Sequence, residues 1–171
     1  MKPRRMVRTL ILVLVVTPLA FFVLGQFGLL KGTPPTDLGV RDGRLKAPST
    51  SPNSVSSQAR LWAGHPRAEQ AHIEPLALRD GDGPATLALL ARLVQAAPGA
   101  VLVDSRPDYL YAQFTTPLMK YTDDVEFWWD NAQGVLQVRS ASRLGRSDLG
   151  ANRQRVEVLR QRLLSAPAAR P

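Results

Sequence analysis

Residues 123–141 read D-D-V-E-F-W-W-D-N-A-Q-G-V-L-Q-V-R-S-A, and this stretch decides the fold. Apolar and polar side chains alternate along it with the period of a β-strand, and the break N-A-Q-G interrupts the pattern. A break of four residues is typical of an antiparallel hairpin. If Asp130 opposes Val135 across this break, the register of the hairpin is set. Glu126 then lies opposite Arg139 on one face of the sheet, whereas a different register removes this pair.

Two more strand-like runs precede the hairpin, and a helical run lies on each side of the strands. Residues 100–105 and 108–116 are separated by short breaks, which favour antiparallel pairing. A helix is predicted to begin at Gly81–Pro84, because proline suits the first helical turn. A second helix is predicted over residues 152–164. The order α-β-β-β-β-α predicts an α+β domain, in which two helices pack on an antiparallel sheet of four strands or slightly more.

The first 30 residues carry the strongest signal for location. Four basic residues come first, and residues 9–30 then contain no charged side chain. A helix of this length reaches about 33 Å, which matches the hydrocarbon core of a bilayer. The stretch therefore predicts a transmembrane helix whose partner is the lipid bilayer. A cleavable signal peptide is the alternative, although Phe27, Leu29 and Leu30 make a poor cleavage site.

The basic flank also predicts the orientation. Positive residues favour the cytoplasmic side, so residues 1–8 are expected as a cytoplasmic tail. In a bacterium, the protein would be a single-pass inner-membrane protein with its domain in the periplasm. The chain has no cysteine, which excludes a lipoprotein anchor.

The remaining chain divides by composition. Residues 31–53 are rich in proline, glycine and serine, which predicts a flexible linker. The folded domain is expected over residues 54–165, a length that suits one hydrophobic core. Residues 166–171 are expected to form a disordered tail.

The net charge of +8 comes from the two ends of the chain. Residues 1–30 carry four basic groups and no acidic ones, and residues 139–171 carry eight basic and two acidic groups. The residues between them carry 10 basic and 12 acidic groups. The protein is therefore not uniformly basic. This distribution, the predicted compartment and the lack of a recognised motif argue against nucleic acid as a partner.

The arginine-rich turn before the last helix is the candidate binding site. Guanidinium groups bind carboxylate or phosphate bidentately, and the N-terminus of a helix attracts anions. The candidate anion-binding residues are Arg139, Ser142, Arg143, Asn152 and Arg153. Their ligand would be a phospholipid headgroup, an acidic small molecule or an acidic segment of a protein partner.

The same arginines have an alternative interpretation as a structural polar network that holds the last helix to the sheet. Its members would be Asp123, Asp124, Glu126, Arg139 and Asp148. Asp123 or Asp124 would then engage Arg143 or Arg153. Ser147 or Asp148 is expected to cap the last helix.

No catalytic residue, metal ligand or cofactor is assigned from the sequence. Paired carboxylates can supply a general acid, but strand alternation places Asp123 and Asp124 on opposite faces. His65 and His72 have a metal-like spacing only on a helix, and prolines interrupt that region. We expect a non-catalytic binding or structural module of the cell envelope. The alternative is a hydrolase that uses the Asp, Glu and Ser groups of the same region.

Three motifs carry a resemblance to a known family. They are P-N-S-V-S-S-Q at residues 52–58, D-D-V-E-F at residues 123–127 and V-R-S-A-S-R-L-G-R-S-D-L-G-A-N-R-Q-R at residues 138–155. In these motifs the chain resembles the bacterial and plastid family known as domain of unknown function 1499. Ser54 stands where that family usually has cysteine, which argues against a role that needs a thiol. The resemblance implies a domain of envelope proteins and no established reaction.

Overall fold

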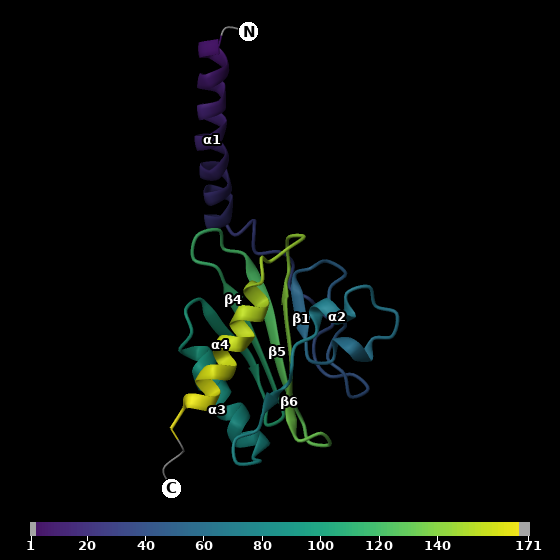
Figure 1. The fold of residues 1–171 in the computed structure, drawn as a ribbon. Coiled ribbons are helices and arrows are strands. Elements are labelled where there is room, and N and C mark those ends of the chain that lie inside the picture. Colours follow the sequence, from purple (N-terminus) through teal and green to yellow (C-terminus); the bar gives the residue numbers. More distant parts are fainter. Residues whose placement is uncertain (1–2, 168–171) are drawn as a thin grey trace.

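An antiparallel sheet forms the centre of the domain (Figure 1). The computed structural model describes residues 3–167. The strands are β1 (Ser54–Ser56), β2 (Leu76–Ala77), β3 (Ala100–Ser105), β4 (Tyr109–Thr115), β5 (Thr122–Asp130) and β6 (Val135–Ser142). Their order is β1-β6-β5-β4-β3, and β2 also pairs with β6. The predicted α+β class and antiparallel sheet are confirmed, and the short strands β1 and β2 extend the sheet beyond β6.

The hairpin register follows the alternation of the sequence. Asp130 pairs with Val135, and Glu126 pairs with Arg139. Because side chains alternate between the two faces, one correct pair fixes the face of every residue in both strands. Glu126 and Arg139 therefore lie on one face with most other polar side chains of the hairpin, whereas Asp123 lies on the other face with most of the apolar ones.

Helices α3 (Gly83–Gln95) and α4 (Ala151–Ser165) cover the apolar face of the sheet (Figure 1). The main core lies between these helices and the sheet. Its buried side chains include Leu87, Leu90, Val125, Phe127, Val138, Val156 and Leu159. The carboxylate of Asp82 caps α3 by accepting a hydrogen bond of 2.8 Å from the backbone N–H of Ala85. Gly83 is required here, because a Cβ at this position would lie 2.1 Å from the ring of Trp129.

Residues 31–53 lie along the polar face of the sheet, and we call this segment the strap. Leu45 within it is fully buried, and its N–H donates to Oε1 of Gln58 over 2.8 Å. The N–H of Gly39 donates to Oε1 of Glu126 over 2.8 Å. The strap therefore differs from the flexible linker that its composition predicts. Its prolines and glycines bend the backbone, and burial and hydrogen bonds to the sheet then hold the bends in place.

Helix α1 (Pro3–Gln26) leads away from the domain (Figure 1). Within the described part of the chain, one helix is long and apolar enough to cross a membrane, and its apolar window is not buried. The helix begins before the expected Thr9, because the basic residues join its first turns. It ends at Gln26 rather than at the expected Leu30. Gly28, just after this end, adopts a left-handed conformation with φ of 76°.

The last turn of α1 contacts the domain directly. Nε2 of Gln26 donates to the carbonyl of Leu118 over 2.8 Å. A Cβ on Gly25 would lie 2.6 Å from the carbonyl oxygen of Met119, so only glycine permits this approach. Of the expected terminal tails, residues 3–8 belong to α1, and residues 1–2 and 168–171 lie outside the described residues.

The buried position of Leu45 predicts that the strap contributes to folding. Replacing a buried leucine by alanine removes transfer energy and leaves a cavity, so Leu45→Ala should cost about 2–5 kcal/mol. Urea unfolding of the full chain in a mild detergent, monitored by tryptophan fluorescence, measures this loss of stability. Leu61→Ala is the control, since Leu61 is 46% exposed. Equal stability of the two variants would show that the strap is not part of the cooperative fold.

Candidate functional site

Two ion pairs lie beneath the strap on the polar face of the sheet. In the first, Nε and Nη2 of Arg143 donate to the two carboxylate oxygens of Asp124 over 2.8 and 2.7 Å. Both side chains are buried, and the hydroxyl of Tyr111 also donates to Asp124. This bidentate geometry is the strongest form of the arginine–carboxylate pair. It joins the turn after β6 to the middle of the sheet.

The second pair centres on Glu126, which is fully buried. Its carboxylate accepts hydrogen bonds from the hydroxyl of Tyr109 and the N–H of Gly39, each over 2.8 Å. Nη1 of Arg139 contacts its other oxygen at 3.4 Å, and Nε of Arg139 donates to the carbonyl of Ala47. A buried carboxylate is tolerated only when its charge and lone pairs are satisfied. The strap backbone therefore completes the environment of both Glu126 and Arg139.

The surroundings of Tyr109, Tyr111 and Arg143 fix the charge states of these three side chains. Burial and the adjacent Glu126 carboxylate raise the pKa of Tyr109. Burial and the hydrogen bond to Asp124 likewise raise the pKa of Tyr111. The hydrogen bond to Asp124 raises the pKa of Arg143. Both tyrosines therefore stay neutral donors and Arg143 stays charged at physiological pH.

A third ion pair lies on the opposite, helix-covered face of the sheet. Arg155 of α4 pairs with Asp123 of β5, and its Nη1 donates to Oδ1 of Asn152 over 2.7 Å. Buried Asn152 also accepts from Ser140 and donates to the carbonyl of Asn53. These bonds hold α4 to the sheet. The sequence pattern favoured Arg143 or Arg153 as the partner of Asp123, and Arg155 takes that place because it lies one turn after Asn152.

Asp148 lies in the turn just before α4, which begins at Ala151. Its carboxylate accepts hydrogen bonds from the N–H groups of Gly150 and Asn152 over 3.0 and 2.9 Å. Burial alone would raise the pKa of Asp148, but these donors outweigh burial and lower it. The Asp148 carboxylate thus acts as a side-chain cap of the first turn, although Gly150 is the residue that directly precedes α4. The N–H groups of Gly150 and Asn152, which an external anion could otherwise bind, already have this internal partner.

The structure divides the candidate anion-binding residues among three places. Arg139, Ser142 and Arg143 line a cavity of about 350 Å³ between the strap and the sheet, which we call the strap cavity. Asn152 is buried in the network below α4. Arg153 donates to the backbone carbonyls of Gln70 and His72, outside the strap cavity.

Three cationic side chains line the strap cavity. Lys46 of the strap joins Arg139 and Arg143 in its lining, and Asp124 is the lining carboxylate. Nη2 of Arg139 and Nη1 of Arg143 donate no hydrogen bond to any of residues 3–167. The Lys46 ammonium pairs with Asp37 at 2.6 Å, where both side chains are partly solvated. Sequence reasoning missed Lys46, because its surroundings read as a linker.

The geometry gives no support to catalytic or metal chemistry at the other candidate residues. Ser140 donates its hydroxyl to Asn152, and the Ser142 hydroxyl accepts from the same side chain. His72 contacts Glu74 at 3.1 Å, and His65 accepts from the backbone of its own turn. Within residues 3–167, the His, Asp and Glu side chains form no group of three that could hold a metal ion.

Neutralising Asp124 should destabilise the fold strongly. Asp124→Asn leaves the buried Arg143 charge without its partner, which costs about 3 kcal/mol or more. The matched control is Glu69→Gln, because Glu69 also accepts a two-point contact from an arginine, Arg60, but on the surface. Solvent and salt screen that exposed pair, so this control should unfold like the wild type. Urea unfolding of the full chain measures both, and similar midpoints would contradict a structural role for the Asp124 pair.

Comparison with known proteins adds a family but no activity. No curated protein and no solved structure matches the chain. The family model described as "Protein of unknown function (DUF1499)" matches residues 44–163. The match begins within the strap and ends in α4, so it includes the three ion pairs and most of the strap cavity lining, but not Thr33 and Pro35. Since it spans more than half of the sequence, this chain belongs to the DUF1499 family of proteins of unknown function.

Proposed function

We propose that this protein is a membrane-anchored module of the cell envelope that binds a small phosphate or carboxylate group in the strap cavity without catalysing a reaction. The observation that carries the proposal is the group of three cations, Lys46, Arg139 and Arg143, that line this one cavity. Guanidinium and ammonium groups with unused N–H donors are suited to oxyanions. A volume of about 350 Å³ is enough for a small ligand and too small for a folded partner.

Helix α1 supports the anchoring part of the proposal. Its uncharged segment has the length of a bilayer core, and the domain does not cover it. The basic residues at its start favour a cytoplasmic N-terminus and a domain outside the cytoplasm. In a bacterium the domain would then lie in the periplasm, held at the inner membrane.

The path of the strap favours a lipid headgroup as the source of the anion. Thr33 and Pro35 line the strap cavity, and they follow the end of α1 by only a few residues. Gly32 packs so closely on Arg143 that a Cβ would lie 2.7 Å from the Cβ of Arg143. One side of the cavity is therefore built by chain that has just left the membrane. A free phosphate ester presents the same chemistry and is the second source to test.

A hydrolase remains the alternative function, and the strap cavity does bring Asp124 and Ser142 to one lining. However, Arg143 and Tyr111 hold the Asp124 carboxylate, and Ser142 accepts from Asn152. Neither group has the activating partner that nucleophilic catalysis needs. The geometry therefore favours binding over hydrolysis.

Removing the positive charge of Lys46 in the strap should weaken anion binding. We expect Lys46→Met to lower the affinity for glycerol 3-phosphate about tenfold, because a charged hydrogen bond contributes about 1.5 kcal/mol. Isothermal titration of the full chain in a neutral detergent measures this affinity. The control is Arg60→Met, which removes another paired surface cation far from the cavity and should leave the affinity unchanged.

A second arm of the same titration separates the two anion sources. The full chain in phosphatidylcholine nanodiscs with a fraction of phosphatidylglycerol should bind glycerol 3-phosphate more weakly than in pure phosphatidylcholine if the lipid headgroup occupies the strap cavity. Equal affinities in both discs would assign the cavity to a free ligand. No binding by the wild type, or the same loss in Lys46→Met and Arg60→Met, would contradict the proposed function.

The proposed anchoring of the protein by α1 has its own test. The full chain expressed in a bacterium should stay in the membrane pellet after alkaline carbonate washing and need detergent for extraction. Its intact mass should include residues 1–30. A chain that is recovered in solution with a shorter mass would instead identify α1 as a cleaved signal sequence.

A further inference from the structure

We propose that the end of the domain next to α1 rests on the bilayer, so that its loops place leucine side chains among the lipid headgroups. This surface, the membrane rim, consists of residues 27–31, 117–120 and 144–149. The inference rests on the proposed anchoring by α1. It adds a second membrane contact, made by the folded domain itself, which fixes how the strap cavity sits relative to the lipid.

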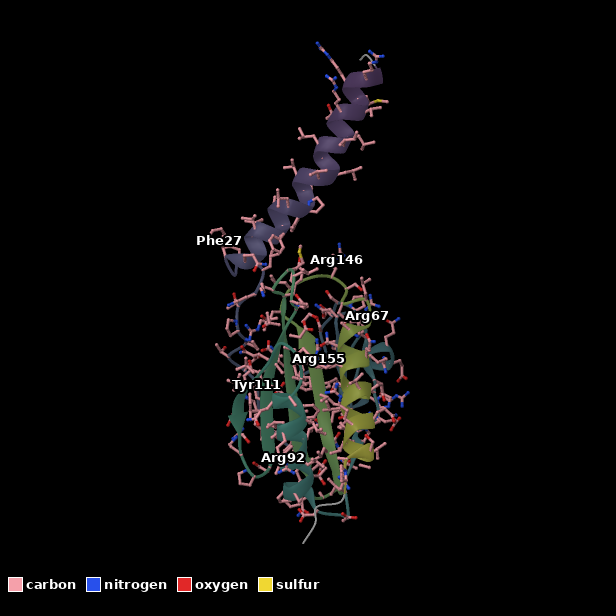
Figure 2. The ribbon with its side chains drawn as sticks, turned by 90° about the vertical axis from the view of Figure 1, so that its left-hand side faces the viewer. Phe27, Arg67, Arg92, Tyr111, Arg146 and Arg155 are labelled. Carbon is pink, nitrogen blue, oxygen red and sulfur yellow. The ribbon has the colours of Figure 1, made fainter. Side chains whose placement is uncertain are left out.

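The membrane rim collects exposed apolar side chains from three separate segments. Their exposed fractions are 80% for Phe27, 66% for Leu29, 66% for Leu118, 40% for Leu144 and 97% for Leu149. The loops before β5 and after β6 lie at the end of the sheet from which α1 leaves (Figure 1). Figure 2 shows Phe27 and Arg146 near this same end. A cluster of exposed apolar side chains is unfavourable in water and marks a contact surface.

The backbone at Leu149 strengthens this interpretation. Leu149 adopts a φ of 52°, a left-handed conformation that leucine rarely takes. The neighbouring carboxylate of Asp148 holds the turn by accepting from the N–H groups of Gly150 and Asn152. The result is a bulky apolar side chain held outward with almost no contact to the domain. Contact with lipid would bury it.

The charges of the membrane rim fit an anionic lipid surface. Lys31, Lys120 and Arg146 are its basic residues. The nearby carboxylates already have internal partners, since Asp123 pairs with Arg155 and Asp148 caps α4. Basic residues beside exposed leucines are the composition of surfaces that lie at a membrane interface.

The contact between α1 and the domain explains why this end meets the bilayer. Gln26 and Gly25 touch the loop that carries Leu118 and Met119, so no extended spacer separates the helix from the rim. When α1 spans the bilayer, its last turn lies at the interface, and the attached loop lies there too. The membrane is therefore the occupant that follows from the chain itself.

Because the chain has no cysteine, single cysteines can report on depth in the full-length protein. We would attach a nitroxide to Leu149→Cys, to Val13→Cys in α1 and to Ala132→Cys in the turn after β5. The protein is placed in vesicles of phosphatidylcholine and phosphatidylglycerol. Power-saturation measurements then compare collisions with oxygen, which prefers lipid, and with a polar nickel complex, which prefers water.

We expect the oxygen-to-nickel ratio at position 149 to rise clearly above that at position 132, toward the value at position 13. Equal ratios at 149 and 132, with position 13 in the hydrocarbon, would overturn the membrane rim and leave the anchor intact. A water-exposed label at position 13 would overturn the anchor and the rim together. Dipolar broadening between labels at 149 would assign the surface to a second copy of the chain and would also overturn the proposal.

Discussion

The structure depends on the burial of two carboxylates, those of Asp124 and Glu126, on the polar face of the sheet, opposite the face that α3 and α4 cover. Each carboxylate is acceptable there only because an arginine, a tyrosine and other donors surround it. Glu126 needs the N–H of Gly39, and its partner Arg139 needs the carbonyl of Ala47. The strap is therefore a required layer of the fold, and the sheet would expose unsatisfied charge without it.

This requirement connects α1 to the candidate site. The strap begins shortly after α1 ends and then forms one wall of the strap cavity. The proposed anchoring of α1 would therefore place the candidate site next to the lipid. The buried arginines serve the fold through some of their donors, and the proposed function assigns the remaining donors to a ligand.

Much of this could be predicted from the sequence because the decisive information is local. Alternation and a four-residue break fixed the register that pairs Glu126 with Arg139. The network hypothesis paired Asp123 or Asp124 with Arg143 or Arg153, and the structure selects the pair of Asp124 and Arg143. The apolar periodicity of residues 152–164 located α4 within one residue at each end. These signals depend on neighbours in sequence or on the adjacent strand, which a single chain displays.

The rest depends on long-range packing that local patterns do not encode. The strap has the composition of a linker. Its order comes from the burial of Leu45 and from hydrogen bonds to the polar face of the sheet, which composition does not reveal. Lys46 was missed for this reason, and Arg155 was missed because its partner Asp123 faces the helices. Hydrogen exchange at the N–H of Gly39 tests the central claim most directly. If Glu126 holds the strap, this amide should be protected like that of Phe127 in β5, and exchange as fast as at the exposed turn residue Gly64 would contradict the account.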